Sequence, residues 1–296
     1  MANSTVPISL RCRLSRPDIV VAPGIYDALT ASLAEAAGFD ALYLSGAAMA
    51  YTRLGGPDLG LVTMSETAEA IRLIRERVKA PLIVDGDTGY GNALNVERTV
   101  RAFERAGANA IQIEDQTFPK RCGHLADKSL VSREEMAGKI RAAAASRGSQ
   151  EFLIIARTDA VAVEGLDAAL ARADAYLEAG ADLLFVEAPR DHAMLSTITA
   201  RLGNRAPLMA NMVEGGLTPM LDARELQALG YRLVIFPGGI VRAVAKTAEA
   251  YYASLAAHGT NAPFRDRMFD FNELNQRMGT VEALRRAAAY DREESR

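Results

Sequence analysis

The sequence is poor in residues that several classes of protein need. It has only two cysteines, Cys12 and Cys122, so a disulfide framework is excluded and a reducing cytoplasm is the expected compartment. The three histidines (His124, His192 and His258) lie far apart and lack the spacing of a zinc site. Hydrolysis at a zinc centre is therefore not expected.

Charge and hydropathy disfavour two kinds of partner. The formal net charge is -3 and the pI is about 5.8, without a dominant cluster of lysine or arginine, so nucleic acid is not an expected partner. No apolar run approaches the ~20 residues that a membrane helix needs. Residues 1–18 also lack the apolar segment of a secretory signal. The expected partners are small molecules and further copies of the chain.

Hydrophobic residues, by contrast, make up 49% of the chain, enough for a large α/β core. They gather in short apolar runs that end in polar residues and are followed by alanine-rich helical patterns. Continuous apolar character is typical of parallel strands buried on both faces. The runs are Ile19–Ala22, Ala41–Gly46, Pro81–Asp87, Ala110–Asp115, Phe152–Asp159, Leu183–Ala188, Leu208–Met212 and Leu233–Gly238.

The segments that lead into these runs repeat. AAGFDALYL, RAGANAIQI, EAGADLLFV and ALGYRLVIF each end a helix with glycine, which tolerates the left-handed backbone of a helix C-terminus. Eight such units predict a single (β/α)8 barrel over residues 1–296, and an open doubly wound sheet is the alternative. Amphipathic patterns from about residue 263 predict a helical extension whose apolar side chains form an oligomer interface.

Polar residues follow almost every predicted strand. In a (β/α)8 barrel these positions meet at the C-terminal face, where barrel enzymes carry out chemistry. Two connections, 47–63 and 116–131, exceed the usual ~2–6 residues, and the second is a predicted lid. The polar residues at or beyond strand ends are Ser45, Asp85, Asp87, Glu114, Asp115, Arg157, Asp159, Glu187, Asn211 and Arg242.

The segment VDGDTGYGN contains two of these carboxylates. Asp85 and Asp87 are one residue apart in a predicted strand, so both side chains are expected on the same side. Together with Glu114 they make an oxygen-rich site of the kind that Mg2+ or Mn2+ prefers. The alternative is that these carboxylates cap helices or pair with Arg157.

The predicted lid carries the segment KRCGH. Cys122 has Arg121, Gly123 and His124 as neighbours, a setting that favours an acid–base or nucleophilic thiol over an inert buried one. Nearby cations lower the pKa of a thiol and nearby carboxylates raise it, and the sequence leaves open which effect prevails.

Several cations and polar side chains are candidates for substrate binding. Arg157, Arg242 and Lys120 are suited to clamping substrate carboxylates. For an arginine the alternative is an ion pair with Glu187 or Asp159.

Smaller polar groups have two interpretations each. Asn211 and Ser45 either orient carboxylate oxygens or cap helices, and Tyr43 either points into the barrel top or packs inside it. His192 and His258 are expected to be solvated or in the core, and Cys12 to be structural. No predicted strand ends in lysine, so a Schiff-base aldolase is disfavoured.

Five segments together resemble the isocitrate lyase/phosphoenolpyruvate mutase superfamily, in order, over roughly residues 16–258. Its branch of 2-methylisocitrate lyase, 2,3-dimethylmalate lyase and carboxyphosphonoenolpyruvate mutase is the most similar. The resemblance implies a TIM-type barrel and a cytoplasmic homotetramer, a dimer of dimers that exchange the eighth helix. The segments are KRCGH, DGDTGYGN, YLSG, ARTDA and NMVEGG.

The resemblance also implies roles for individual residues. Asp85 and Asp87 hold Mg2+ (or Mn2+), and Glu114 reaches it through water. Cys122 is the acid that protonates the departing enolate. The remaining positions contact the carboxylate substrate, namely Ser45, Gly46, Ala47, Lys120, Gly123, His124, Arg157, Glu187, Asn211 and Arg242.

The expected activity is Mg-dependent carbon–carbon lyase chemistry on a hydroxy di- or tricarboxylate. A base (Tyr43, Glu114 or a metal-bound water) removes the hydroxyl proton, and Cys122 supplies the final proton. The sequence departs from methylisocitrate lyases in its SGAAMA loop and in Pro237–Gly239. The alternatives are a carboxyphosphonoenolpyruvate-type phosphonomutase, an oxaloacetate decarboxylase or hydrolase, and a barrel that binds carboxylates without catalysis.

Overall fold

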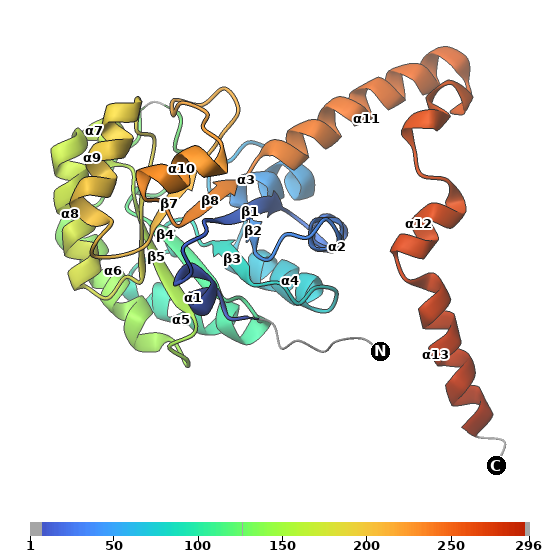
Figure 1. The fold of residues 1–296 in the computed structure, drawn as a ribbon, viewed down its shortest axis with the longest axis horizontal. Coiled ribbons are helices and arrows are strands. Elements are labelled where there is room, and N and C mark those ends of the chain that lie inside the picture. Colours follow the sequence, from blue (N-terminus) through green and yellow to red (C-terminus); the bar gives the residue numbers. More distant parts are fainter. Residues whose placement is uncertain (1–7, 126, 294–296) are drawn as a thin grey trace. The chain divides into compact units, whose positions relative to one another are not determined.

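Eight parallel strands form a closed barrel in the computed structural model, which describes residues 8–125 and 127–293. Closure is made by β1 and β8, where Val20 pairs with Leu233. The predicted (β/α)8 barrel is confirmed, and the doubly wound alternative is wrong because an open sheet has no such pairing. The strands are β1 (Val20–Ile25), β2 (Leu42–Leu44), β3 (Leu82–Asp85), β4 (Ala110–Glu114), β5 (Leu153–Thr158), β6 (Leu183–Val186), β7 (Leu208–Asn211) and β8 (Leu233–Phe236) (Figure 1).

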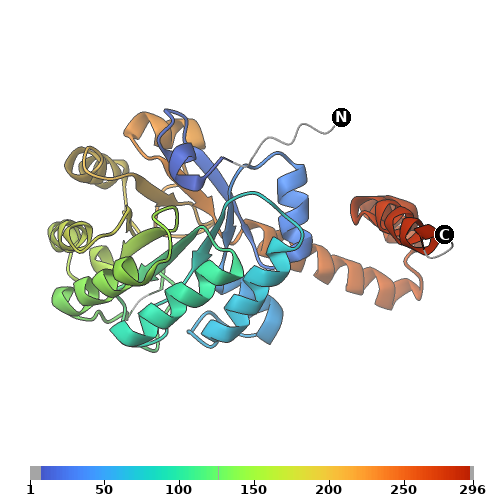
Figure 2. The ribbon, with the colours of Figure 1, turned by 90° about the horizontal axis from the view of Figure 1, so that it is seen from below.

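Helices surround the strands on the outside of the barrel (Figure 2). Several begin at a capping box: at Thr63, for example, the side chain accepts from the Glu66 N–H, and Glu66 accepts from the Thr63 N–H in return. The helices of the barrel are α1 (Leu10–Leu14), α2 (Ala28–Ala36), α3 (Gly46–Met49), the π-helix η1 (Ala50–Leu54), α4 (Met64–Arg75), α5 (Ala93–Ala106), α6 (Arg133–Ser146), α7 (Ala160–Val163), α8 (Leu166–Glu178), α9 (His192–Leu202) and α10 (Ala223–Leu229). The next helix, α11 (Gly239–His258), belongs mostly to the C-terminal unit that begins at Arg242.

The segment 47–63, which the sequence predicts as a long loop, is partly helical. α3 and η1 occupy its first half. The apolar and small residues there, including the buried Met49, pack into the core, which favours helix over irregular chain.

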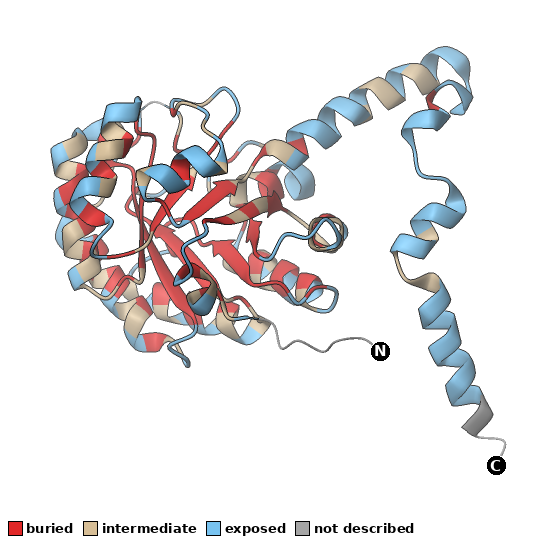
Figure 3. Ribbon diagram, viewed as in Figure 1, coloured by how far each residue is buried: buried red, intermediate tan, exposed pale blue. Residues whose placement is uncertain are grey.

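Successive side chains along a strand alternate between two hydrophobic cores, one inside the barrel and one between the strands and the surrounding helices, as the period of two in a strand requires. In β5, Leu153 and Ile155 belong to the inner cluster, whereas Ile154 packs with the surrounding helices. Leu10 and Leu14 of α1 join the inner cluster, so this short helix closes the N-terminal end of the barrel. Figure 3 shows the strands buried and the outer faces of the helices exposed.

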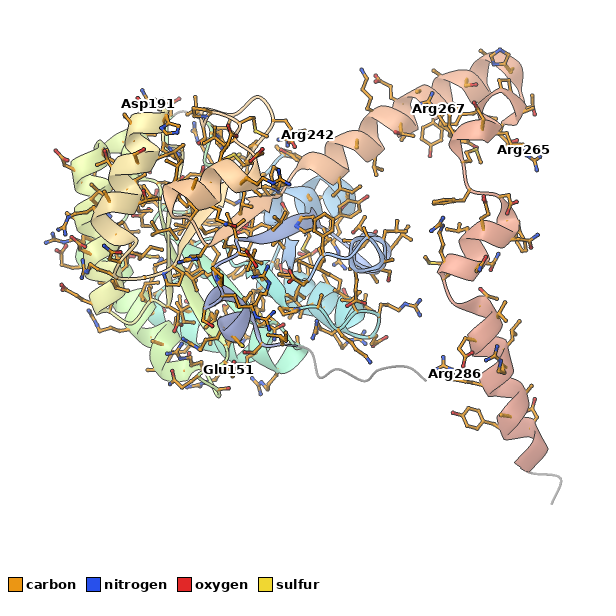
Figure 4. The ribbon with its side chains drawn as sticks, viewed as in Figure 1. Glu151, Asp191, Arg242, Arg265, Arg267 and Arg286 are labelled. Atoms are coloured by element: carbon orange, nitrogen blue, oxygen red, sulfur yellow. The ribbon has the colours of Figure 1, made fainter. Side chains whose placement is uncertain are left out.

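The two ends of the barrel differ in chemistry. Glu151 precedes β5 and marks the N-terminal end, while Asp191 follows β6 and caps α9 at the other end (Figure 4). Because apolar residues fill the inner cluster up to the strand ends, charged side chains gather beyond it at the C-terminal mouth.

A second unit comprises Arg242–Arg296 and includes most of α11. It continues with the 3-10 helix η2 (Ala262–Arg267), α12 (Phe271–Arg277) and α13 (Thr280–Glu293). Phe264 is buried there beneath Tyr251 and the Arg267 guanidinium, the latter 4.2 Å from its ring centroid (Figure 4). The predicted C-terminal helices are thus present, and the predicted exchange of the eighth helix between subunits stays a prediction.

Among the helices formed by residues 8–125 and 127–293, none combines the length and apolar character needed to cross a membrane.

Candidate active site

The last inward-facing position of successive strands carries a charged or polar residue. Asp85 ends β3, Glu114 ends β4, and Asn211 ends β7, each continuing the inward series of its strand. Arg157 lies one residue before the end of β5, and Glu187 directly follows β6. The structure therefore brings these five predicted residues to the C-terminal mouth of the barrel.

Asp85 and Asp87 approach each other, but not by the predicted geometry. The strand stops at Asp85, and Asp87 has φ of 45°, so the expectation that both lie on one strand is wrong. The chain turns after Gly86, and the Asp87 N–H donates to Asp85 Oδ1 at 3.2 Å. A β-carbon on Gly46 would stand 3.1 Å from Asp85 Oδ2 and 3.3 Å from Asp87 Oδ1, so both carboxylates lie against the Gly46 backbone.

Lys120 faces this carboxylate pair from the lid. Its Nζ lies 2.8 Å from Asp87 Oδ1 and donates a short hydrogen bond to Asp58, which follows η1. Lys120 and Asp58 are both buried. Burial raises the pKa of Asp87 to about 6, aided by Asp85 and opposed by Lys120. Lys120, which the sequence analysis predicts as a substrate clamp, thus forms ion pairs with Asp58 and Asp87.

Arg157 is held by three carboxylates. Its Nε donates to Asp159 Oδ2 at 2.9 Å and lies 3.3 Å from Glu114 Oε2. Its Nη2 lies 3.4 Å from Glu187 Oε2. The ion pairs that the sequence left open as the alternative for this arginine are therefore present. Burial raises the pKa of Glu114 well above its usual value, although Arg157 opposes the shift.

Asp115, next to Glu114, faces the opposite way. Its carboxylate accepts from Thr158 Oγ1 at 2.7 Å, from the Asp159 N–H at 2.9 Å and from the Tyr176 hydroxyl at 2.8 Å. Consecutive residues of a strand point to opposite faces, so Asp115 belongs to the layer between the barrel and α8. It supports the mouth from outside.

Cys122 lies in a tight turn of the lid. The Leu125 N–H donates to the Cys122 carbonyl at 2.9 Å, and the cysteine is half-buried and free. Burial raises the pKa of its thiol, while a hydrogen bond from the His124 backbone opposes the shift. The shift favours the protonated thiol, and its largest cause is burial rather than the nearby charges that the sequence analysis weighed. Arg121 lies 3.6 Å from Asp127.

Gly123 and His124 place this turn on the mouth. A β-carbon on Gly123 would stand 2.3 Å from Arg157 Nη2 and 2.6 Å from Glu187 Cγ. His124 Nδ1 accepts from the Leu217 N–H at 3.0 Å, and its Nε2 lies 3.3 Å from Glu187 Oε1. Burial lowers the pKa of His124. The lid backbone therefore rests directly on the charged residues.

The remaining predicted residues of the first unit also border the mouth. Tyr43 belongs to the inner cluster and donates to Gln112 Oε1 at 2.8 Å, so it points into the barrel, a feature that both of its interpretations share. Ser45 caps α3 by accepting from the Ala48 N–H at 3.2 Å, which is the capping role weighed for it. Gly46 donates to Asp85 Oδ2 at 3.3 Å, and Ala47 follows in α3.

The sequence also predicts roles for Arg242, the other two histidines and Cys12. Arg242 is the first residue of the second unit, and its part in the site stays a prediction (Figure 4). His192 and His258 are exposed, in line with a solvated role. Cys12 is exposed as well, so the expected structural role is wrong: the buried side chains of its helix are Leu10 and Leu14.

The carboxylates at the mouth fit a hard divalent cation that keeps several waters. Glu114 Oε1 is buried without a hydrogen-bond donor among the described residues, and Asp87 Oδ1 is met by Lys120 outside hydrogen-bond geometry. Within residues 8–125 and 127–293 no three His, Cys, Asp or Glu side chains converge on one metal-binding point. A site here would rest on the Asp85 and Asp87 carboxylates, which both lie against Gly46, with waters as further ligands, as Mg2+ commonly has.

Comparison with known proteins decides the family. Residues 10–256 match the family described as phosphoenolpyruvate phosphomutase. The chain belongs to the phosphoenolpyruvate phosphomutase family. The predicted resemblance to the phosphoenolpyruvate mutase/isocitrate lyase superfamily is thereby confirmed.

Relatives within the family carry lyase names. The chain is 44% identical to a 2,3-dimethylmalate lyase from Eubacterium barkeri over 91% of its own length and 93% of that protein. It is 46% identical to a 2-methylisocitrate lyase from Aeropyrum pernix, over 96% of its length and 90% of that protein.

Solved structures of the family have the same fold. Oxaloacetate acetylhydrolase with the inhibitor 3,3-difluorooxalacetate matches with a TM-score of 0.90 and 33% identity, over 96% of each chain. A phosphonopyruvate hydrolase in complex with oxalate and Mg++ matches with a TM-score of 0.85 and 32% identity, over 95% of this chain and 96% of that one.

Three residues of this site escaped sequence analysis. Gln112 joins Tyr43 to Asp85, donating from Nε2 to Asp85 Oδ1 at 3.2 Å. Its signal was available, since Gln112 stands two residues before Glu114 in a strand and shares its face. Asp58 and Lys128 lie in irregular segments, where no period relates a residue to the mouth.

Proposed function

We propose that the protein is an Mg-dependent carbon–carbon lyase. Its substrate is a hydroxy di- or tricarboxylate of the 2-methylisocitrate or 2,3-dimethylmalate type. The observation that carries the proposal is the Cys122 turn, where a half-buried thiol with a raised pKa directly precedes Gly123, which lies against Arg157 and Glu187 at the barrel mouth. Relatives named as lyases at 44% and 46% identity support the same reaction class.

Asp85 and Asp87 would hold the metal, and Glu114 would contact it through water. A bound Mg2+ would supply positive charge that offsets the negative charge of the 2-oxo acid fragment. Lys120 opposes the mutual repulsion of the aspartates, because its ammonium group contacts Asp87 directly. Mn2+ is the expected substitute because it accepts the same oxygen ligands.

The substrate carboxylates would lie between α3 and Arg157. Ser45, Gly46 and Ala47 offer a hydroxyl and backbone N–H groups where α3 begins. Asn211 donates to Glu187 Oε2 at 3.0 Å, and its buried Oδ1 has no donor among residues 8–125 and 127–293. Ligand groups are well suited to satisfy such an acceptor. Lys120, Gly123, His124 and Arg242 complete the proposed substrate contacts.

Two of the proposed groups handle protons. Burial raises the pKa of Tyr43 well above its usual value, and its hydroxyl donates to Gln112, so Tyr43 is a poor base. Glu114 has an open, buried oxygen and a raised pKa, and it is the better base for the substrate hydroxyl. Cys122 then donates its proton to the carbon of the departing enolate, with Arg157 stabilising the charge.

The test is release of a 2-oxo acid. A panel of 2-hydroxy di- and tricarboxylates, including 2-methylisocitrate and 2,3-dimethylmalate, is incubated with Mg2+ and assayed for pyruvate or glyoxylate. We expect one of these acids to be cleaved at a rate at least a hundredfold above the others. Absence of cleavage across the panel contradicts the proposal.

A second candidate reaction is hydrolysis of oxaloacetate. It is favoured by the TM-score of 0.90 to oxaloacetate acetylhydrolase, a structure that contains 3,3-difluorooxalacetate. Oxalate and acetate as the products of oxaloacetate would identify this reaction. A separate incubation with phosphoenolpyruvate and Mg2+, followed by phosphorus NMR, tests for a phosphonate, the product of the mutase alternative.

We also propose a cytoplasmic homotetramer, a dimer of dimers that exchange the eighth helix. The support lies in the second unit, where large apolar side chains are exposed: Phe271 is 82% exposed, Tyr290 69% and Leu284 66%. Such side chains call for a covering surface. Light scattering after size-exclusion chromatography measures the molar mass of the assembly, and the mass of a monomer at micromolar concentration contradicts the proposal.

A further inference from the structure

Lys128 is a buried cation that the proposed reaction does not use. Its side chain is 1% exposed, as completely enclosed as the Asp159 side chain that it contacts at 2.9 Å. Its Nζ also donates a short hydrogen bond to the carbonyl of Gly123. A buried ammonium group is costly unless it is paired and hydrogen-bonded, so these two contacts determine where Lys128 lies.

Asp159 is a fixed anchor for this lysine. Its backbone N–H is bound by Asp115 at 2.9 Å, and its carboxylate accepts from Arg157 Nε at 2.9 Å and from Arg157 Nη2 at 3.1 Å. Burial alone would raise its pKa, but the charges of Arg157 and Lys128 outweigh burial and lower the pKa of Asp159 to about 2. Asp159 is therefore an anion that belongs to the rigid barrel.

The other contact of Lys128 belongs to the lid. The Gly123 carbonyl follows Cys122 directly, within the turn closed by the hydrogen bond from Leu125 to Cys122. Gly123 also lies against Arg157 and Glu187 without space for a β-carbon. Within the described residues, Lys128 thus connects the barrel anchor Asp159 to the backbone that carries the thiol.

We propose that Lys128 is a positioning residue that holds the Cys122 turn against Arg157 and Asp159. The role rests on the proposed function, in which Cys122 is the acid. Without the Lys128 ammonium group, Asp159 still binds Arg157 but is no longer connected to the Gly123 carbonyl, so the Cys122 turn can move away from the barrel mouth. The thiol then becomes accessible to solvent and loses its alignment with the substrate carbon.

The test uses alkylation of the two cysteines in one molecule. Intact Lys128→Met protein is treated with iodoacetamide, and mass spectrometry gives the ratio of the Cys122 to the Cys12 alkylation rate. Cys12 is exposed and serves as the internal reference. We expect this ratio to rise at least tenfold. With the preferred substrate, kcat falls at least tenfold while KM changes less than threefold.

Arg147→Met is the matched control. Arg147 is a half-buried cation that likewise donates to one aspartate, Asp182, at 2.5 Å and to one backbone carbonyl, Phe152, at 3.1 Å. It lies before β5, at the other end of the barrel. We expect this control to lose thermal stability while its alkylation ratio stays within twofold of wild type.

Each outcome is decisive. An unchanged ratio in folded Lys128→Met protein overturns the proposal, as does an equal rise in Arg147→Met protein. If Lys128→Met protein does not fold, Lys128→Arg is tested instead, because arginine keeps the positive charge but does not fit the positions of both Asp159 and the Gly123 carbonyl. A Cys122 to Cys12 alkylation ratio less than threefold above that of wild type then overturns the positioning role. Alkylation does not require catalysis. If the wild-type protein cleaves none of the acids in the panel, the proposed function is refuted, while a raised alkylation ratio in Lys128→Met protein still supports the positioning role.

Discussion

Gly123 and Arg157 lie so close that a β-carbon on the glycine would stand 2.3 Å from the arginine Nη2 atom. This contact joins the segment that carries Cys122 to the barrel mouth, because Gly123 follows Cys122 and Arg157 pairs with three carboxylates at or just beyond strand ends. The contact therefore places the turn that carries Cys122 beside Arg157 at the barrel mouth.

Replacement of Gly123 by alanine tests this contact. The added methyl group meets both Arg157 and Glu187, which are held in place by their ion pair, so the turn must shift. We expect Gly123→Ala to lower kcat at least a hundredfold, since small displacements from a productive geometry are costly. Steady-state kinetics on the preferred substrate measure the effect.

Gly138→Ala is the control for this replacement. Gly138 lies inside α6, and the only atom near its added β-carbon is Arg141 Nη2 at 3.8 Å. Because alanine is preferred over glycine in a helix, this variant should gain about 0.5–1 kcal/mol of stability at unchanged activity. Wild-type activity in Gly123→Ala protein would show that close contact between lid and mouth is not needed for turnover.

Replacement of Cys122 by serine removes the proposed acid. A hydroxyl has almost the same shape but is a far weaker proton donor, so turnover should fall by about 10²–10⁴-fold. Binding of Mg2+ should persist, because the thiol lies outside the proposed ligand set. Single-turnover kinetics and calorimetric titration with Mg2+ separate the two effects, and undiminished turnover would refute the role of the thiol.

The pH profile should reflect the raised pKa of the Cys122 thiol. Only the protonated thiol donates a proton, and burial stabilises that form, so activity should persist through neutral pH and fall only above about pH 8.5. The measurement is kcat against pH beside thiolate absorbance in Cys12→Ser protein. A Cys122 thiolate that forms below pH 8 would show a lowered thiol pKa and would contradict this prediction.

Removal of the divalent metal should abolish activity without unfolding the barrel. Lys120 contacts Asp87 and Asp58, so the aspartates keep a compensating cation when the metal is absent. Added Mg2+ should then raise the midpoint of thermal unfolding, because it binds only the folded chain. The free energy of unfolding should increase by about 2.7 kcal/mol at an Mg2+ concentration of 100 Kd.

Asp87→Asn protein should lose this shift. Asp174→Asn, which removes a carboxylate paired with Arg201 and Arg205 on the outer helices, should retain it. An equal shift in both variants would place the metal elsewhere.

The sequence by itself determined the barrel and the end of it that carries the chemistry. Continuous apolar runs require strands buried on both faces, and the glycine that ends each helix sets the repeat, so both features are local. The residues after each run then fall at one end of the barrel whatever the details of packing. Asp85, Glu114 and Asn211 were found in this way.

Only the tertiary structure decided what those residues touch. Glu114 and Asp115 are neighbours in sequence, yet one faces the mouth and the other contacts Tyr176 of α8. Asp58 reaches Lys120 across 62 positions, and Lys128 reaches Asp159 across 31. Contacts between irregular segments have no period that a sequence can display, and the protonation of Cys122 follows from burial, which depends on the whole fold.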